Sequence, residues 1–569
     1  MIELQLDEVL YNSGILGLCR VFDSVNLPFE KKGQTVTFAE SNLSNFEEHY
    51  FASLVDLYGS ETSYYKMVNT YSKQFVKKCI EGITEEKELE QFNTLIDNMK
   101  RWLTSNSYKN VYPFLTEIPY DFEASAKSFK KVNKKKKETL EDVQLQVTEM
   151  ARGLLECLSF LEHKQAKRYI IPRILSYQVI QGFWSNVSLL NSDASKKDLY
   201  VEYENYFIQP AENYLETKKD EKKYAKNKLT CACCDNKMKS AAKKKSATEA
   251  FDLTWVQKVG VDAARKSSHY WDHQRDIFIC PICNIVYSCI PLGFTLARGA
   301  GLFINNNRSV DDLISINSIS LKAGKVDLSR DDLESMAYYQ LLDLMSQQAE
   351  NQKLLEIDNI QIVKYDRNSE SRPYTFNMLS REKAQQMYVS RKDFQFLVGK
   401  FVKENGEYLS LYQEVLRRFY NGQGFADLLY RLLRLVIDDD FKGMASIYKI
   451  LNISNNRFKG RAHFMTQEEL RKIRISGYYL KQAYRGQEAK LNAISYRLLN
   501  ALKVKNPNKF MDTIFQAYSY KKNEKLAIPT FFIQALNDIE KFQTIGYAFL
   551  IGLNGYEKSE DEKEDTTNE

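Results

Sequence analysis

Five of the nine cysteines stand in two short clusters whose spacing can bind a metal ion. The first cluster contains Cys231, Cys233 and Cys234, and the second contains Cys280 and Cys283 after 45 intervening residues. A Cys-x-x-Cys pair folds into a tight turn that directs two sulfurs to one point, and two such turns supply the four thiolates of a structural Zn²⁺ site. Only Cys231 and Cys234 match the two-residue gap of the second pair. We therefore predict structural zinc bound by Cys231, Cys234, Cys280 and Cys283.

Other uses of these cysteines fit the pattern less well. A redox Cys-x-x-Cys usually stands alone at the start of a helix, whereas here two pairs occur and lysine-rich sequence follows the first. A catalytic zinc needs an open coordination position and usually a His or carboxylate ligand with a general base. His269 and His273 are the only candidates for that role, and the fragment HYWDH lacks the glutamate of HExxH. The remaining cysteines lie among apolar neighbours and are expected in cores: Cys19, Cys79, Cys157 and Cys289.

The bulk composition is that of a soluble globular protein with several domains. The chain has 569 residues, of which 44% are hydrophobic and 27% are charged. It has no run of 18 apolar residues, and its acidic start MIELQLDEVL is unlike a secretory signal. We therefore expect neither a transmembrane helix nor a signal peptide. Cysteines in a metal-binding pattern fit a reducing cytoplasm.

Positive charge is concentrated in part of the chain. The net charge is +6, but residues 442–541 contain 19 Lys and Arg against 7 Asp and Glu, and residues 557–569 contain 7 acids against 2 lysines. Four consecutive lysines occupy 134–137, and further lysines surround the first cysteine cluster. A basic body with an acidic tail favours a polyanionic partner. A solvated basic surface is the alternative.

Hydrophobic patterning predicts a helix-dominated, mixed α+β protein. Its N-terminal α/β part contains the four-cysteine module, and its C-terminal part is a helical bundle. The strongest helical patterns lie at 9–22, with Asn12 or Ser13 near the start, at 139–161, and in two helices within 409–437. The C-terminal bundle is predicted from helices at 466–485, 488–504, 508–520 and 530–553, with Pro507 and Pro529 at helix starts. Strands are expected at 285–290 and 294–296.

These patterns divide the chain into five parts. We expect an N-terminal domain at 1–195, a zinc-binding module with adjoining strands at 196–320 and a helical region at 321–440. The C-terminal helical bundle spans 441–556, and a disordered acidic tail follows at 557–569. The boundary before the bundle is placed at Asp438, Asp439 and Asp440, which form a hydrophilic break. No nucleotide-binding or hydrolase motif stands out, which favours a binding role over catalysis.

Several motifs together resemble one family. They are the two cysteine pairs, the opening YNSGILGLCRVF, the segment PLGF followed by GAGLFINNN, and the closing YAFLIGL. On these motifs the chain is identified as a member of the CRISPR-associated CXXC–CXXC protein family, the large subunits of type I-B Cascade. The resemblance spans most of the chain. The additional Cys233 and the long insert depart from the pattern and leave the ligand register open.

The resemblance implies a non-catalytic subunit of an RNA-guided antiviral surveillance complex. Such a subunit lies near the 5′ end of the guide RNA and recognises the protospacer-adjacent motif on duplex DNA. It promotes unwinding and R-loop formation, and a separate helicase-nuclease is then recruited. The other implied partners are the backbone and guide-processing subunits. A small subunit is also implied, made in related systems from an internal start codon. Here Met465 follows Lys459-Gly460-Arg461, which can be encoded by purine-rich codons, so we expect a product of residues 465–569.

Candidate contacts to nucleic acid follow from side-chain chemistry alone. Cations bind phosphates and amides bind base edges, and three of the cations share a face of the predicted helix at 466–485. The candidates are Lys134, Lys135, Lys136, Lys137, Arg298, Asn305, Asn306, Asn307, Arg308, Arg474, Lys481 and Arg485.

Two other classes of function compete with this assignment. A zinc-dependent nucleic-acid-processing enzyme, such as a nuclease or deaminase, needs an acidic residue beside an open metal position, and four cysteine ligands leave none. A stand-alone zinc-stabilised basic scaffold would bind nucleic acid weakly and without regard to guide RNA.

Overall fold

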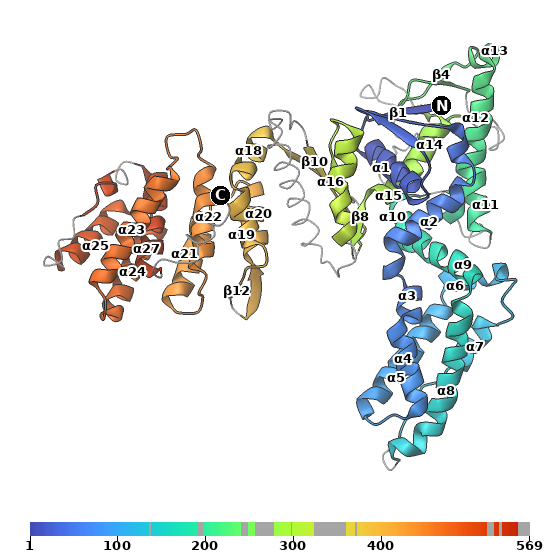
Figure 1. Cartoon of the computed structure of the whole chain (residues 1–569), viewed down its shortest axis with the longest axis horizontal. Helices are drawn as coiled ribbons and strands as arrows, with labels where there is room; N and C mark the ends of the chain where they lie inside the picture. Colours follow the sequence, from blue (N-terminus) through green and yellow to red (C-terminus); the bar gives the residue numbers. More distant parts are fainter. Residues whose placement is uncertain are drawn as a thin grey trace. The chain divides into compact units, whose positions relative to one another are not determined.

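In the computed structural model, the first helix, α1 (Val9–Ser24), is buried along most of its length (Figure 1). This confirms the buried helix predicted for 9–22. The helix begins at Val9, as predicted, and the carboxylate of Glu8 caps it by accepting hydrogen bonds from two backbone N–H groups of the first turn. A carboxylate at this position satisfies N–H groups that have no partner inside the helix.

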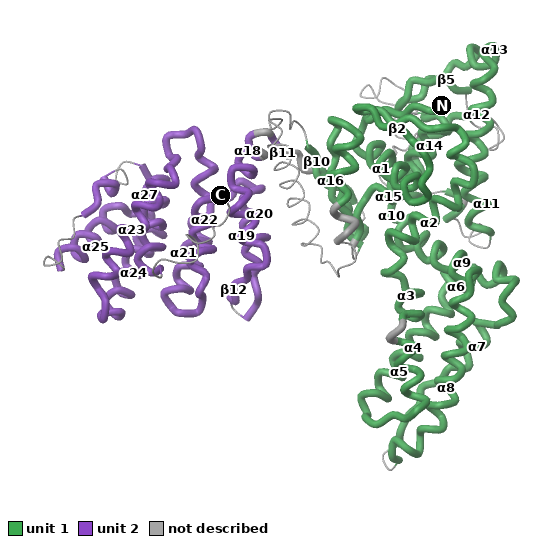
Figure 2. The backbone as a smooth tube through the Cα atoms, viewed as in Figure 1, with its two compact units in different colours: residues 1–333, 360–378 green, residues 334–359, 379–569 purple. Residues whose placement is uncertain are grey.

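The chain divides into two compact units (Figure 2). Residues 1–333 and 360–378 form the N-terminal unit, and residues 334–359 and 379–569 form the C-terminal unit. Helices dominate both, with small sheets, which confirms the helix-dominated α+β class. The five-part division into domains remains a prediction. The structure describes residues 1–135, 138–185, 187–190, 197–239, 249–256, 278–297, 299–323, 360–369, 373–404, 406–520, 528–533 and 538–555.

The described part of the N-terminal unit consists of a series of helices, two larger sheets and two two-stranded sheets, β4 (Leu229–Thr230) with β5 (Lys237–Met238) and β6 (Phe251–Asp252) with β7 (Phe278–Ile279). The first of the larger sheets has the order β1 (Ile2–Gln5), β3 (Thr35–Phe38), β2 (Phe29–Lys32). The second has the order β11 (Tyr374–Leu379), β10 (Ile360–Asp366), β9 (Ala300–Asn305), β8 (Thr295–Ala297). The main helices besides α1 are α2 (Phe46–Tyr58), α3 (Ser63–Val68), α4 (Thr70–Glu81), α5 (Glu86–Leu103), α7 (Phe122–Ser128), α8 (Leu140–Leu161), α9 (Lys164–Leu175), α11 (Leu199–Tyr203), α12 (Gln209–Lys219), α13 (Glu221–Tyr224), α14 (Pro281–Ser288), α15 (Ile290–Gly293) and α16 (Val310–Ala323).

The segment after the second cysteine pair is helical. The strand predicted at 285–290 is wrong, because this segment lies in α14, the following Cys289 and the start of α15, all of them buried. An apolar run that is buried on every side has no periodicity that separates a strand from a helix. Pro281 occupies the first helical position, where its missing N–H has no cost. The strand predicted at 294–296 is confirmed within one residue as β8.

α1 packs directly against α14 and α15 through glycine. A Cβ atom at Gly17 would lie 2.1 Å from the carbonyl oxygen of Cys289, and one at Gly14 would lie 2.3 Å from that of Val286. From the other side, a Cβ at Gly293 would lie 2.0 Å from the carbonyl oxygen of Ser13. The backbones therefore approach to a distance that only glycine permits. This contact fixes the helix that carries Cys283.

Aromatic rings and buried thiols fill the core around this contact. The rings of Tyr50 and Tyr203 stack at 4.7 Å between centroids, and Trp184 and Trp255 meet edge to face at 5.6 Å. The four thiols predicted in cores, at Cys19, Cys79, Cys157 and Cys289, are all buried, which confirms that prediction. Burial raises the pKa of the Cys19 thiol to about 12, so it stays protonated.

The C-terminal unit consists of one hairpin and a helical array. Its strands are β12 (Phe401–Glu404) and β13 (Glu407–Ser410). Two helices flank residues 421–425, and Pro507 begins a third, as predicted. No described helix of the chain is long and apolar enough to cross a membrane. The helices of this unit are α18 (Arg381–Val389), α19 (Arg391–Leu397), α20 (Leu411–Tyr420), α21 (Ala426–Ile437), α22 (Met444–Asn456), α23 (Gln467–Ala483), α24 (Glu488–Lys503), α25 (Pro507–Tyr520) and α27 (Ile539–Asn554).

The last helices confirm most of the predicted bundle. α23, α24 and α25 match the helices predicted at 466–485, 488–504 and 508–520 within two residues at each end. α27, at residues 539–554, covers most of the region predicted at 530–553, and the side chain of Asp538 caps its first turn; residues 534–537 lie outside the described residues. α23 and α27 pack closely, since a Cβ at Gly552 would lie 1.8 Å from the carbonyl oxygen of Arg474.

Candidate metal centre

The first cysteine cluster lies in a short hairpin between β4 (Leu229–Thr230) and β5 (Lys237–Met238). The N–H of Cys231 donates to the carbonyl oxygen of Asn236 at 2.9 Å, which closes the turn. Asp235 adopts a left-handed conformation with φ of 56° within this turn. The tight reversal brings the side chains of Cys231 and Cys234 to one side.

The second pair lies where strand β7 (Phe278–Ile279) leads into α14. Cys280 precedes the first residue of the helix, and Cys283 lies in its first turn. The carbonyl oxygen of Phe278 accepts a hydrogen bond from the N–H of Ala232 at 3.0 Å, so the strand is attached to the hairpin of the first pair. Two local turns, far apart in sequence, thus face each other.

The four predicted ligands form a compact group. The sulfur atoms of Cys231, Cys234, Cys280 and Cys283 all lie within 4.8 Å of one another, and those of Cys234 and Cys280 are 3.6 Å apart. A tetrahedral Zn²⁺ with Zn–S bonds of about 2.3 Å places its sulfurs about 3.8 Å apart. Cys231, Cys280 and Cys283 are buried and Cys234 is half-buried. The group therefore has the donor atoms, spacing and enclosure to hold a metal ion.

Hydrogen-bond donors surround the sulfurs. The backbone N–H of Cys280 donates to the Cys231 sulfur at 3.2 Å, and Nδ2 of Asn236 donates to the Cys234 sulfur at 3.1 Å. The hydroxyl of Tyr11, on α1, lies 3.2 Å from the Cys283 sulfur. Donors of this kind stabilise thiolates and orient ligands. Of the two side-chain donors, only Asn236 could be suspected from the sequence, because it lies two residues from Cys234. Tyr11 is far from the cysteines in the sequence.

The thiols influence one another's protonation. Hydrogen bonds from Cys233, Cys234 and two further thiols lower the pKa of Cys231 well below its ordinary value. The pKa of Cys283 is raised, first by its hydrogen bond to Cys231 and also by burial. A bound cation would stabilise all four sulfurs as thiolates, so metal binding would release protons.

Cys233 stands outside the four-sulfur group, whose members are those of the predicted register with Cys234. Its sulfur lies 3.7 Å from the hydroxyl of Tyr287, and that hydroxyl donates to the carboxylate of Glu8 at 3.0 Å. Burial raises the pKa of Glu8, although two backbone N–H groups of α1 oppose this by donating to it. Cys233 therefore links the hairpin to the start of α1.

Lysines near the hairpin are partly engaged with the protein. Lys218 Nζ donates to Asn236 Oδ1 at 3.0 Å, and Lys219 forms an ion pair with Glu40 at 2.7 Å. Lys239 pairs with the buried Glu249 at 2.8 Å. The predicted basic surface around the site is therefore interrupted by acidic partners. His269 and His273 lie outside the described residues.

Asparagines at the end of β9 form hydrogen bonds to other segments of the N-terminal unit. Asn305 is 1% exposed, accepts from Asn12 Nδ2 at 3.0 Å and donates to Gln361 Oε1 at 3.0 Å. Asn306 is also buried, whereas Asn307 is exposed and accepts from the same Asn12 amide. The amide of Asn305 is fully used inside the protein, so it is not available to a base edge. Arg308 is half-buried and pairs with Asp312.

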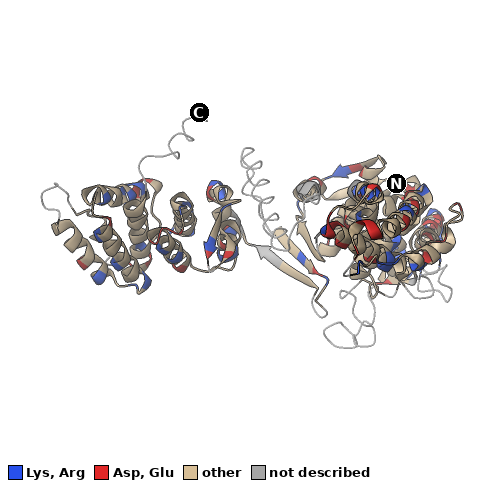
Figure 3. Ribbon diagram, turned by 90° about the horizontal axis from the view of Figure 1, so that it is seen from below, with Lys and Arg blue, Asp and Glu red and all other residues tan. Residues whose placement is uncertain are grey.

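The other predicted nucleic-acid contacts are divided between the two units. Lys134 and Lys135 pair with Glu86 and Glu138, while Lys136, Lys137 and Arg298 lie outside the described residues. The three cations predicted to share a helix face, Arg474, Lys481 and Arg485, lie in different surroundings. Arg474 lies over the Tyr448 ring, Lys481 is half-buried and bonds the carbonyl oxygen of Gly555, and Arg485 lies beyond the end of α23. Figure 3 shows basic positions spread over the helices of the C-terminal unit.

A comparison with known families matches the segment that builds this centre. Residues 224–295 match the model of a CRISPR-associated protein family, Cas_CXXC_CXXC. The matched segment contains both cysteine pairs, the hairpin and all of α14. No curated protein and no solved structure matches the chain. The match falls on the residues that build the four-cysteine centre, and it supports the resemblance to the CRISPR-associated CXXC–CXXC family that the motifs predict.

Proposed function

We propose that this protein is the large subunit of a type I-B Cascade, the RNA-guided surveillance complex of a CRISPR system. It recognises the protospacer-adjacent motif and promotes target unwinding and R-loop formation without cutting DNA. The observation that supports this most directly is the four-cysteine group within the family-matched segment. Sequence reading is left to guide pairing, while the protein reads a short motif and the shape of the backbone.

The metal of this subunit is Zn²⁺, and its role is structural. Four thiolates at tetrahedral spacing suit zinc, and they leave no open position for a water or substrate. Because such a site does not exist in the unfolded chain, the free energy of metal binding stabilises the folded state. The ion would hold the hairpin of Cys231 against the buried helix that carries Cys283, which supports a non-catalytic function.

The partners follow from this role. The subunit contacts guide RNA, target duplex DNA and the backbone and guide-processing subunits in the cytoplasm of a prokaryote. A helicase-nuclease is recruited in trans. Phosphate contacts from the basic segments supply affinity, and a few base contacts supply the motif preference. Exposed lysines on α13 and beside the hairpin, such as Lys222 and Lys228, are available for such contacts.

The decisive experiment measures guide-dependent DNA binding. The chain is expressed with and without its neighbouring CRISPR subunits and guide RNA, and binding is measured to a matched target duplex whose flanking motif is randomised. We expect binding that requires the guide and selects a short flanking motif. Binding that ignores both would contradict the proposal and favour a zinc-stabilised basic scaffold. Cleavage of the target by the chain alone would favour the enzyme.

A second product from the same gene is expected. Translation from Met465 would give residues 465–569, which contain α23, α24, α25 and α27. These helices pack on one another through the close contact of Gly552 with α23, so the fragment keeps a core of its own. It would lose the side chain of Asn455, which bonds both the N–H and the carbonyl oxygen of Met465.

The purified complex is expected to contain this fragment, identified by the mass of its N-terminal peptide. Replacing the Met465 codon by one for leucine should remove the fragment and leave the full-length chain. A complex that never contains the fragment, or one whose fragment survives this change, would contradict the prediction.

A further inference from the structure

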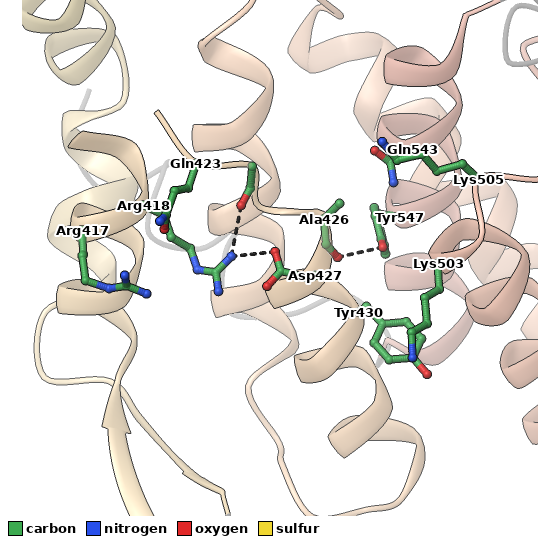
Figure 4. Close-up of a pocket in the computed structure, with 11 residues that line it drawn as sticks. Arg417, Arg418, Gln423, Ala426, Asp427, Tyr430, Lys503, Lys505, Gln543 and Tyr547 are labelled. Carbon is green, nitrogen blue, oxygen red and sulfur yellow. Dashed lines mark hydrogen bonds and ion pairs between the residues drawn. The ribbon is translucent and has the colours of Figure 1, made fainter. Parts of the chain in front are cut away.

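The C-terminal unit contains an open groove with a basic lining (Figure 4). Its volume is about 580 Å³, within the range of about 300–1,000 Å³ that is usual for ligand sites. The groove lies where the C-terminal ends of α20 and α24 meet the N-terminal halves of α21 and α27. Four cations and one carboxylate line it: Arg417, Arg418, Lys503, Lys505 and Asp427.

The two arginines are neutralised by the protein. Arg418 is 8% exposed; its Nε lies 2.6 Å from Glu414 Oε1, and its Nη1 lies 2.6 Å from Asp427 Oδ1. Arg417 makes a bidentate pair with the same Glu414, with a distance of 2.9 Å from Nη2 to Oε2. These contacts hold the arginines in place along one wall. The surplus charge of the groove therefore comes from its lysines.

Lys503 and Lys505 are exposed, and no carboxylate of the described residues lies within ion-pair distance of either. Lys503 Nζ lies 4.7 Å from the centroid of the Tyr430 ring, and Figure 4 shows the two side chains together. Tyr430 also lines the groove and is half-buried. The Lys503 ammonium group thus stands beside an aromatic ring, and Lys505 adds a second positive charge to the same groove. Cations combined with an aromatic ring are typical of sites for single-stranded nucleic acid.

The backbone at Lys505 gives a second, independent observation. Lys505 follows the end of α24 with φ of 51°, in the left-handed region, and its N–H donates to the carbonyl oxygen of Leu502 at 3.1 Å. Glycine is the residue that ordinarily ends a helix in this conformation, because a side chain there is strained. A lysine held in this position places its charge on the groove at the cost of that strain. Strained residues of this kind are concentrated at binding sites.

We propose that this groove binds the sugar–phosphate backbone of a single nucleic-acid strand. Lys503 and Lys505 neutralise its phosphates, and the ring of Tyr430 packs against a sugar or an unpaired base. The arginine wall fixes the shape of the groove and adds no net charge. The choice of a nucleic acid as the ligand, and not another polyanion, rests on the proposed function. The geometry of the groove is independent of the proposed function. An acidic protein segment is the competing ligand.

The test uses the purified full-length chain and a fluorescein-labelled oligothymidylate of about 15 nucleotides, followed by fluorescence anisotropy. The variant Lys503→Gln/Lys505→Gln should bind the oligonucleotide about tenfold more weakly at low salt, because two phosphate contacts are lost. Each phosphate contact on a single strand contributes about 0.7 to the slope of log K against log salt, so the slope should fall by about 1.4. Both lysines are exposed, so folding should be unaffected.

Four further variants test whether the effect is specific to the groove. Lys392→Gln/Lys403→Gln removes the same charge from exposed positions of the same unit outside the groove, and should leave the affinity near that of the parent. Lys505→Gly should weaken binding while keeping or raising the unfolding temperature, because glycine relieves the strain at this position. Tyr430→Leu should weaken binding, and Tyr430→Phe should retain it, since the ring is what packs.

Two results would overturn this proposal. One is an equal loss of affinity in the groove variant and the control pair, which would indicate only general electrostatic attraction. The other is a polyglutamate peptide that binds the parent and is not displaced by the oligonucleotide, which would assign the groove to an acidic protein segment. The oligonucleotide assay requires neither guide RNA nor other subunits. Failure of the chain to assemble into a guide-dependent complex would therefore contradict the proposed function and leave the groove result intact.

Discussion

Replacing Cys283 with serine is expected to reduce the zinc content from about one ion per chain to nearly none. The Cys283 sulfur is fully buried and lies among the other three ligands, so its loss leaves three thiolates around the ion. Structural zinc contributes on the order of 10 kcal/mol or more to the folding of small metal-dependent modules. The N-terminal unit is larger than such modules and has a core of its own, so we expect a smaller loss. The free energy of unfolding of this unit should still fall by at least about 3 kcal/mol.

A matched control is available six residues further along the chain. Cys289 is equally buried and its thiol is not part of the four-sulfur group, so Cys289→Ser makes the same chemical change without touching the metal. This variant should keep its zinc and lose about 1–2 kcal/mol for the buried hydroxyl. Cys233→Ser should keep its zinc as well. Zinc is measured by elemental analysis of the dialysed protein.

The outcomes separate the ligands from their neighbours. If Cys283→Ser retains one ion per chain, the assignment of the four ligands is wrong. If Cys233→Ser releases the ion, then Cys233 and not Cys234 completes the site. Cys231→Ser should behave as Cys283→Ser does, because both sulfurs belong to the same group.

The four-sulfur group could be predicted from the sequence because each cysteine pair is a local turn. Two residues between cysteines fix the direction of both sulfurs, whatever the rest of the chain does. The donors around the sulfurs could not be predicted in the same way. Tyr11 reaches the Cys283 sulfur across 272 positions of sequence, and Tyr287 reaches Glu8 across 279. Contacts of this kind depend on how α1 packs against α14, which no local pattern records.

The incorrect predictions have a common physical origin. The segment at 285–290 is apolar throughout, so its periodicity was uninformative, and burial on all sides accommodates it as a helix. Asn305 has the chemistry to read a base edge, but its amide is bonded to Asn12 and Gln361. The type of a side chain indicates which groups it can bind. It does not indicate whether the folded protein already supplies such a group. Lys503 and Lys505 are the opposite example. They line the C-terminal groove, although no run of consecutive charged residues marks them in the sequence.

Replacing Gly17 with alanine is expected to destabilise the N-terminal unit by about 2 kcal/mol. The added Cβ would lie 2.1 Å from the carbonyl oxygen of Cys289 and 3.0 Å from its carbonyl carbon, so the backbones of α1 and α15 must separate. Overpacking of a core costs about 1–3 kcal/mol, and a backbone obstacle gives way less readily than a side chain. Alanine recovers up to about 1 kcal/mol through its higher helix propensity, which reduces the net loss.

Gly153 offers the matched control, because it is also in the interior of a helix but has space beside it. A Cβ there would meet only the ring of Phe129, at an ordinary contact distance of 3.5 Å, so Gly153→Ala should stabilise the protein by up to about 1 kcal/mol. Because two units unfold in this chain, hydrogen exchange of peptides from α1 and α14 is a better measure than one melting curve. Faster exchange in both peptides is expected for Gly17→Ala and not for Gly153→Ala. Zinc should also be released more readily to a chelator in Gly17→Ala, since α14 carries Cys283. Unchanged exchange in Gly17→Ala would show that α1 and α15 can separate at little cost, and the metal centre would then not depend on this contact.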